Sequence, residues 1–119
     1  MEIKTKRIYD TYSPDDGFRI LVDRLWPRGV KKETLKYDSW EKDIAPSNEL
    51  RRWFHQDKTG NWNEFESRYA RELESSDSAK AFIEEIKPHK TITLLYGAKD
   101  REHNQVLILK PFLERQLKR

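Results

Sequence analysis

Short runs of apolar and β-branched residues predict the strands of a sheet. Ile3–Tyr9 is short and alternates between apolar and polar positions, as a strand with one buried face does. The turn-forming segment Asp10–Gly17 follows it, and Phe18–Val22 is then a short apolar run typical of a buried strand. Thr91–Tyr96 is the clearest strand pattern in the chain, and it ends at Gly97.

Apolar residues that recur at helical spacing predict helices in the rest of the chain. Their expected starts are an N-cap at Ser47, an N-cap at Asn61, Asp77 or Ser78, and Asn104, where a last helix begins that runs roughly to Lys118. The first three apolar stripes consist of Leu50, Trp53 and Phe54, of Trp62, Phe65, Tyr69 and Leu73, and of Ala79, Phe82, Ile83 and Ile86. Pro111 lies in the last segment, so we expect a kink there, or a short strand followed by a helix that begins near Pro111.

The alternation of strands and helices predicts the fold class. Strands separated by helices form a βα-type pattern, so residues 1–119 are expected to be a single compact α/β domain with a small, mostly parallel sheet and flanking helices. In open α/β sheets, ligands bind beyond the carboxyl ends of the strands. That rule indicates two segments, Asp23–Gly29 and Tyr96–Asp100, which share one edge if the strands are parallel.

The composition restricts the class of protein. The 119 residues include four Trp, five Tyr and five Phe, which are large enough to build a core. The absence of Cys excludes disulfides, thiolate catalysis and cysteine-ligated metal sites. A net charge of +3 is weak evidence for a nucleic-acid partner. No apolar run suits a membrane helix and the start lacks a signal-peptide pattern, so a cytoplasmic domain without a membrane partner is expected.

The segment Asp23-Arg-Leu-Trp-Pro-Arg-Gly29 carries the most unusual combination of residues in the chain. Arg24 and Arg28 stand on a loop stiffened by Pro and Gly, and two guanidiniums can hold a phosphate or carboxylate by bidentate hydrogen bonds. Trp26 between them offers a stacking face. In the alternative interpretation Asp23 pairs with one Arg, Trp26 packs in the core and Arg28 is solvated.

The segment Tyr96-Gly-Ala-Lys-Asp100 occupies the corresponding place after the last predicted strand. Lys99 can neutralise an anion, Tyr96 can stack, and Asp100 can cap the following helix or act as a base. The N-terminus of that helix adds positive potential. The alternative is an ordinary connection between strand and helix, with Asp100 as a cap.

Further candidates come from the predicted helix after Pro46. Ser47 is a cap or an anion ligand at its start, and Lys42 and Arg51 extend a positive rim, although capping and solvated cations are the simpler interpretation. His55 with Asp57 is a possible acid–base pair, against the alternative of a surface histidine. The histidines show no metal-ligand spacing, and neither a metal nor a cofactor is expected.

Several strings of the sequence resemble those of one family. They are Asp23-Arg-Leu-Trp-Pro-Arg-Gly29, Ala45-Pro-Ser47 followed by Leu50-Arg51 and Trp53-Phe54-His55, and Thr93-Leu-Leu-Tyr96 with Ala98-Lys-Asp100. Through them the chain resembles the YeaO-like family, domain of unknown function number 488, over nearly its whole length. The resemblance implies a small α/β domain of uncharacterised function and brings no established catalytic residues. The polar residues that recur in the family coincide with the candidates at the sheet edge.

Together these patterns predict a cavity at the carboxyl edge of the sheet that binds a phosphate-bearing small molecule, a nucleotide or a nucleic-acid fragment. The expected anion-binding residues are Arg19, Arg24, Arg28, Lys42, Ser47, Arg51 and Lys99, and the expected stacking residues are Trp26 and Tyr96. If the site is catalytic, in hydrolysis or transfer at phosphorus or at a glycosidic bond, the acid or base is expected among Asp23, Asp100 and His55.

Two other functions are also compatible with the sequence. A nucleic-acid-binding transcriptional regulator predicts an extended basic surface and an affinity that falls steeply with salt. A protein-interaction module predicts an exposed cluster of aromatic residues. The sequence leaves the oligomeric state open.

Overall fold

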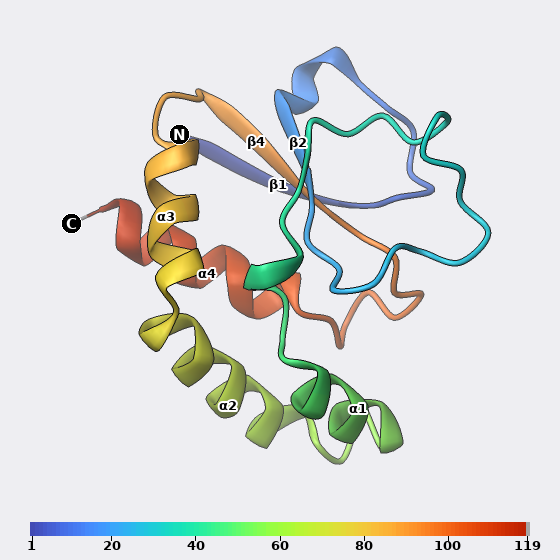
Figure 1. Ribbon diagram of the computed structural model, residues 1–119, viewed down its shortest axis with the longest axis vertical. Coiled ribbons are helices and arrows are strands. Elements are labelled where there is room, and N and C mark those ends of the chain that lie inside the picture. The colour runs from blue at the N-terminus through green and yellow to red at the C-terminus, as the bar shows by residue number, and fades with distance from the viewer. Residues whose placement is uncertain (119) are drawn as a thin grey trace.

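The computed structural model describes residues 1–118, and a parallel β-sheet forms the centre of this part of the chain (Figure 1). Its strands lie in the order β1 (Glu2–Arg7), β4 (Thr91–Tyr96), β2 (Phe18–Leu21) and β3 (Ser39–Trp40). All three strand pairs are parallel, with Ile92 opposite both Ile3 and Phe18. The predicted α/β class with a parallel sheet is therefore confirmed.

The helices are α1 (Asn48–Gln56), α2 (Trp62–Ser75), α3 (Asp77–Ile86) and α4 (Val106–Leu117), with two 3₁₀ turns, η1 (Pro14–Asp16) and η2 (Lys42–Ile44). The hydroxyl of Ser47 accepts a hydrogen bond from the Leu50 amide, which confirms that predicted cap. The cap of α3 is Ser76 rather than Asp77 or Ser78. One helix runs through Pro111, so the predicted alternative of a strand before it is wrong.

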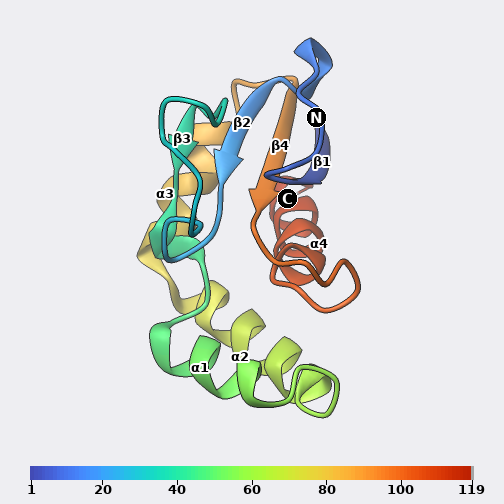
Figure 2. The ribbon, with the colours of Figure 1, turned by 90° about the vertical axis from the view of Figure 1, so that its right-hand side faces the viewer.

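The alternation of side chains along the strands directs one face of the sheet toward the helices. Ile20 and Val22 at β2, and Ile92 and Leu94 of β4, belong to the main core together with residues from all four helices. The arrows of β2 and β4 point toward the layer formed by α1 and α2 (Figure 2). The layer of α1 and α2 therefore lies beyond the carboxyl ends of β2 and β4.

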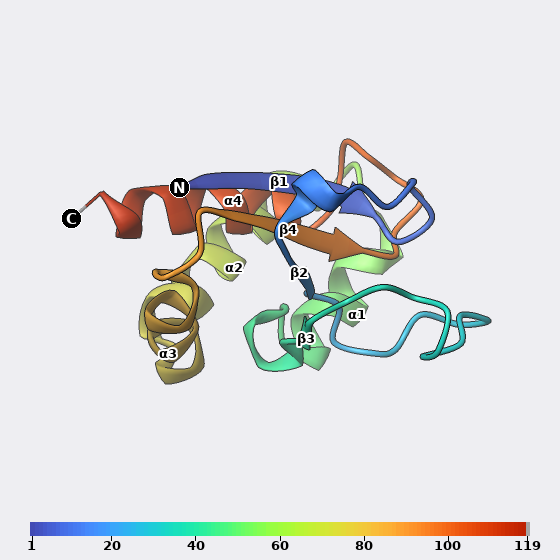
Figure 3. The same ribbon diagram turned by 90° about the horizontal axis from the view of Figure 1, so that it is seen from above.

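The opposite face of the sheet is covered by a loop instead of a helix. Leu21 and Leu95 project into a second, smaller apolar cluster with Leu35, and Trp26 packs against it. The indole of Trp26 donates a 2.6 Å hydrogen bond to the carbonyl of Val30 within the same loop. The helices thus flank one face only, and the loop lies at the end of the molecule away from both termini (Figure 3).

A buried carboxylate connects the turn after β1 to the sheet. Asp16 ends η1 and forms ion pairs with Arg19 and with Lys6, the latter at 2.7 Å. Burial opposes ionisation, but the hydrogen bonds from Lys6, from the Ser13 amide and from Arg19 outweigh it and lower the pKa of Asp16. Gly17 follows with φ of 67°, a conformation that favours glycine.

None of the helices in residues 1–118 has the length and apolar character needed to cross a membrane.

Candidate functional site

The carboxyl ends of β2 and β4 meet, as parallel pairing requires. Asp23 follows β2 and Gly97 follows β4, and the Gly97 amide donates a 2.9 Å hydrogen bond to Oδ2 of Asp23. The two segments that the sequence indicated are therefore in direct contact. A Cβ atom at Gly97 would lie 2.8 Å from the same carboxylate oxygen, so the backbone approaches it as closely as only glycine allows without adjustment.

A cavity of about 340 Å³ opens beside this contact, between the loop after β2, α1 and the segment that precedes α4. Its apolar lining consists of Leu25, Trp26, Pro27, Pro46, Phe54, Phe65 and Ala98. Its polar lining consists of Asp23, Arg24, Arg28, Arg51, His55, Lys58, His103, Asn104 and Gln105. The size and the mixed lining are typical of small-molecule sites.

Asp23 is the one carboxylate in this lining. Its Oδ1 accepts a 2.7 Å hydrogen bond from Nε2 of Gln105, and its Oδ2 accepts the bond from Gly97. Burial raises the pKa of Asp23 above its ordinary value, and the two hydrogen bonds only partly oppose this effect. The carboxylate is therefore fixed in place by neutral donors and faces a cavity rich in cations.

Arg24 anchors the loop after β2 to the start of α1. Its Nε donates to the carbonyl of Pro46 at 2.8 Å, and its Nη2 donates to that of Ala45 at 3.1 Å. The indole of Trp40 donates to the carbonyl of Asp23 at 2.8 Å, from the other side. These bonds give the cavity a fixed wall, and they engage two of the guanidinium's nitrogen atoms.

Arg51 projects from α1 into the same cavity. Its Nε is buried and has no hydrogen-bond acceptor among residues 1–118. Arg28 is exposed at the rim, and Lys58 lies just beyond α1. With Arg24, four cations face the single carboxylate of Asp23, so the cavity is electropositive.

Two histidines complete the polar lining. Burial, and then the charges of Lys58 and Arg51, lower the pKa of His55, so its imidazole is neutral at neutral pH. Asp57, the predicted partner of His55, accepts instead from the Gly60 amide at 3.1 Å. Among the hydrogen bonds of residues 1–118, none joins His55 to Asp57.

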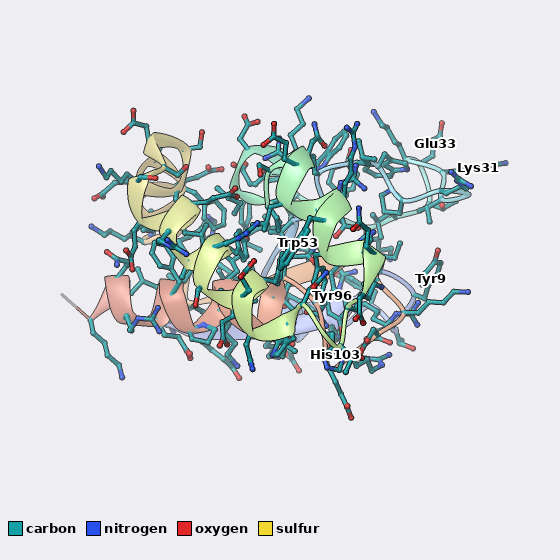
Figure 4. The ribbon with its side chains drawn as sticks, turned by 90° about the horizontal axis from the view of Figure 1, so that it is seen from below. Tyr9, Lys31, Glu33, Trp53, Tyr96 and His103 are labelled. Atoms are coloured by element: carbon teal, nitrogen blue, oxygen red, sulfur yellow. The ribbon has the colours of Figure 1, made fainter. Side chains whose placement is uncertain are left out.

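His103 has the carboxylate partner that His55 lacks. Nδ1 of His103 lies 3.0 Å from Oδ2 of Asp100, while Oδ1 of Asp100 accepts from the amides of Glu102 and His103. The Glu102 amide bond contributes most to lowering the pKa of Asp100. The His103 ring meets that of Trp62 edge-on at 5.3 Å, and Figure 4 shows it beside the turn between α1 and α2. Asp100 is thus outside the cavity lining and positions a residue within it.

The N-terminus of α1 already holds an anion of the protein itself. The Ser47 amide and hydroxyl both donate to the carboxylate of Glu72 in α2, at 2.9 and 2.7 Å. Glu72 therefore occupies the position that the sequence suggested for a phosphate. Ser47 lies outside the cavity lining.

The other predicted site residues lie elsewhere. Arg19 is buried on the far face of the sheet in its ion pair with Asp16. Lys42 is exposed in η2 beside the Trp40 ring, Lys99 is exposed after β4, and Tyr96 is buried in the core. Of the predicted residues, the cavity brings together Asp23, Arg24, Trp26, Arg28, Arg51 and His55.

Sequence reasoning missed part of the lining. Phe54 and Phe65 were assigned to the core, where they do stack at 4.0 Å, yet both also reach the cavity. The spacing of Asp100 and His103 ahead of a helix was a usable signal for the pair they form. Lys58 and Gln105 carried no local signal. No group of three potential metal ligands occurs within residues 1–118.

Comparisons with known proteins place the chain among uncharacterised relatives. A family model described as "Inactive DUF488-N3 subclade" matches residues 2–119. The uncharacterized protein YeaO of Escherichia coli (strain K12) is 42% identical over 113 residues, which cover 95% of this chain and 97% of that protein. The uncharacterized protein Rv3073c of Mycobacterium tuberculosis is 38% identical over 107 residues, which cover 88% of this chain and 89% of that protein. No solved structure matches.

Proposed function

The chain belongs to the inactive DUF488-N3 subclade of the YeaO-like family, and we propose that its cavity binds a small phosphate-bearing ligand such as a nucleotide. The main support for the proposal is the position of the Arg51 side chain and its lack of partners within residues 1–118. Its guanidinium lines the cavity while its Nε is buried without an acceptor in residues 1–118. Because Nε is enclosed by the protein, the ligand is expected to bind the other guanidinium nitrogens of Arg51, which enter no side-chain hydrogen bond or ion pair within residues 1–118.

The charges around Arg51 favour an anion over a neutral ligand. Arg28 at the rim and Lys58 beyond α1 add two cations to those of Arg51 and Arg24. A guanidinium presents its N–H groups in a planar fork that matches the oxygens of a phosphate. Because Arg24 is held by the carbonyls of Pro46 and Ala45, we assign it mainly the role of fixing the wall, and we assign Arg51 and Arg28 the role of binding the phosphate.

The apolar lining supports a ligand with a ring as well as a phosphate. Leu25, which is 57% exposed, and Pro27 supply apolar surface, and the nearly buried, mutually stacked rings of Phe54 and Phe65 lie behind it in the lining. The indole of Trp26 is committed to Val30 and packs edge-on against Tyr37 and Trp40, so its ring contributes an edge of the wall rather than a free stacking face. A nucleobase or a sugar fits such a wall.

The polar lining favours binding without turnover. Both oxygens of Asp23 already accept hydrogen bonds, and the carboxylate of Asp100 accepts one from the Glu102 amide in its own turn. No Ser, Thr or Tyr occurs in the described lining, so it offers no hydroxyl nucleophile. The description of the matched subclade as inactive agrees with this assignment.

A thermal-shift screen with nucleotides, sugar phosphates and inorganic phosphate tests the proposal. A ligand at 100 times its Kd adds about 2.7 kcal/mol, or about 10 °C at this chain length. The Arg28→Ala/Arg51→Ala variant is expected to lose the shift. Arg52→Ala, an exposed site on the same helix outside the lining, is the matched control and is expected to keep it.

Two results contradict the proposal. One is a shift that persists unchanged in the double variant, and the other is the absence of a shift with every phosphate compound. Conversion of a stabilising ligand, measured by chromatography, contradicts the assignment of binding without turnover.

A further inference from the structure

A second groove lies on the face of the sheet opposite the helices, separate from the cavity. One wall is the turn after β1 with Tyr9 and Tyr12, and the other is the loop after β2 with Lys31 and Lys36. The groove has a volume of about 620 Å³, and the smaller apolar cluster forms part of its lining. It shares no lining residue with the cavity.

Two tyrosines of this groove are exposed although their rings are large. Tyr9 is 61% exposed and Tyr12 is 44% exposed. The guanidinium of Arg7 lies 5.0 Å from the centre of the Tyr9 ring, and Nζ of Lys36 lies 4.3 Å from that of Tyr12. The guanidinium of Arg19 also lies 5.2 Å from the centre of the Tyr12 ring, so cations cover part of each ring while the remainder stays exposed, more of it on Tyr9 than on Tyr12.

The charges of the groove favour a polyanion. Asp10, the carboxylate in the groove lining, is already paired with Arg101, and Asp16 is paired with Lys6 and Arg19. The ion pairs within residues 1–118 involve neither of the two lysines that line the groove, Lys31 and Lys36, nor Arg7, which lies over the Tyr9 ring. Glu33, at the outer end of the loop, opposes them with a single charge. Figure 4 shows Tyr9, Lys31 and Glu33 at the same end of the molecule.

We propose that this groove binds single-stranded nucleic acid, with bases stacked on the tyrosines and phosphates along the lysines. Stacking on aromatic side chains next to a basic path is the common mode for single strands. A duplex hides the faces of its bases, and the walls of the groove are a turn and a loop rather than a helix that enters the major groove. An acidic peptide can use the lysines but gains little from two open aromatic rings.

Fluorescence anisotropy with labelled oligothymidylate and oligouridylate at low salt tests this inference. Wild type is expected to bind either single strand more tightly than a duplex of the same length. Tyr9→Ala is expected to weaken binding about tenfold, whereas Tyr9→Phe, which keeps the ring, stays within about twofold of wild type. Lys31→Ala/Lys36→Ala is expected to reduce the slope of log affinity against log salt by about 1.4, or about 0.7 per phosphate contact.

A matched control separates the groove from net charge. Lys80→Ala/Lys87→Ala removes the same charge from exposed positions on α3 and at its C-cap, and is expected to leave the salt slope unchanged. Arg28→Ala/Arg51→Ala, which tests the cavity, is expected to bind oligonucleotides normally, so the two proposals fail independently.

The inference is overturned if wild type does not bind single strands, or if Tyr9→Ala binds as well as wild type. Equal loss in the two lysine variants, or binding to polyglutamate with no preference for oligonucleotides, also overturns it. Circular dichroism of every variant confirms that the fold is retained.

Discussion

Replacing Tyr69 by Phe tests how α2 supports the wall of the cavity. Tyr69 is fully buried, and its hydroxyl donates a 2.7 Å hydrogen bond to the carbonyl of Ile44 in η2. The variant keeps the ring and its stacking on Phe65, so only the hydrogen bond is lost. Leaving a buried acceptor unpaired costs about 1–3 kcal/mol. We expect the free energy of unfolding to fall by about 2 kcal/mol.

Urea unfolding gives this value if the m-value is unchanged, because the midpoint then reports stability alone. In a thermal melt, an unfolding entropy of about 2.1 cal/mol/K per residue over 119 residues converts 2 kcal/mol to a fall in Tm of about 8 °C. Tyr9→Phe, at an exposed ring, is the matched control and is expected to stay within about 0.5 kcal/mol of wild type.

The reasoning is refuted if Tyr69→Phe costs less than about 0.5 kcal/mol, since the hydroxyl would then not be holding η2. The same variant links the fold to the cavity. Ile44 directly precedes Ala45 and Pro46, whose carbonyls hold Arg24. A weaker ligand-induced thermal shift is therefore expected in Tyr69→Phe.

Three further substitutions concern the turn after β1 and the loop after β2. Asp16→Asn is expected to cost about 3–5 kcal/mol at neutral pH, because it leaves Arg19 buried without its partner. Since the pKa of Asp16 is lowered despite its burial, its stabilisation is present above the ordinary pKa of 3.8 and is lost as pH falls through the folded value. Urea unfolding of wild type and variant should therefore converge in acid, and a constant difference contradicts this. Gly17→Ala should cost more than Gly29→Ala by thermal melting, although both have positive φ: a Cβ at Gly17 lies 2.2 Å from the Thr91 carbonyl oxygen, whereas one at Gly29 meets nothing within 4 Å.

The location of the cavity followed from topology. Strand patterns at Phe18–Val22 and Thr91–Tyr96 were strong enough to identify, and parallel pairing forces their carboxyl ends to one edge. The cations of the loop after β2 lay at that edge by sequence position alone. Arg51 could be included in the predicted site because it lies only four residues after the Ser47 cap, within the first turns of α1.

The wrong predictions have different physical reasons, and one of them is a partner from a distant segment of the chain. Ser47 meets Glu72, which is 25 positions away, so the anion that fills the start of α1 could not be read locally. Arg19 was expected to bind an anion, but its ion-pair partner Asp16 is only three residues away, so here a local signal was overlooked. Strand β3 is only two residues long, too short for an alternating pattern in the sequence. It is a strand only through its pairing with β2.

The two outer strands of the sheet are protected in different ways against adding a strand from another molecule. β1 lies at one edge, and its six residues include Lys4, Lys6 and Arg7, which an incoming strand must dehydrate. β3, at the other edge, offers a template of two residues before the chain turns into η2. A partner strand would therefore find either repelling charges or too few backbone groups to pair with. The sheet therefore ends at four strands, because neither of its edge strands suits pairing with a further strand.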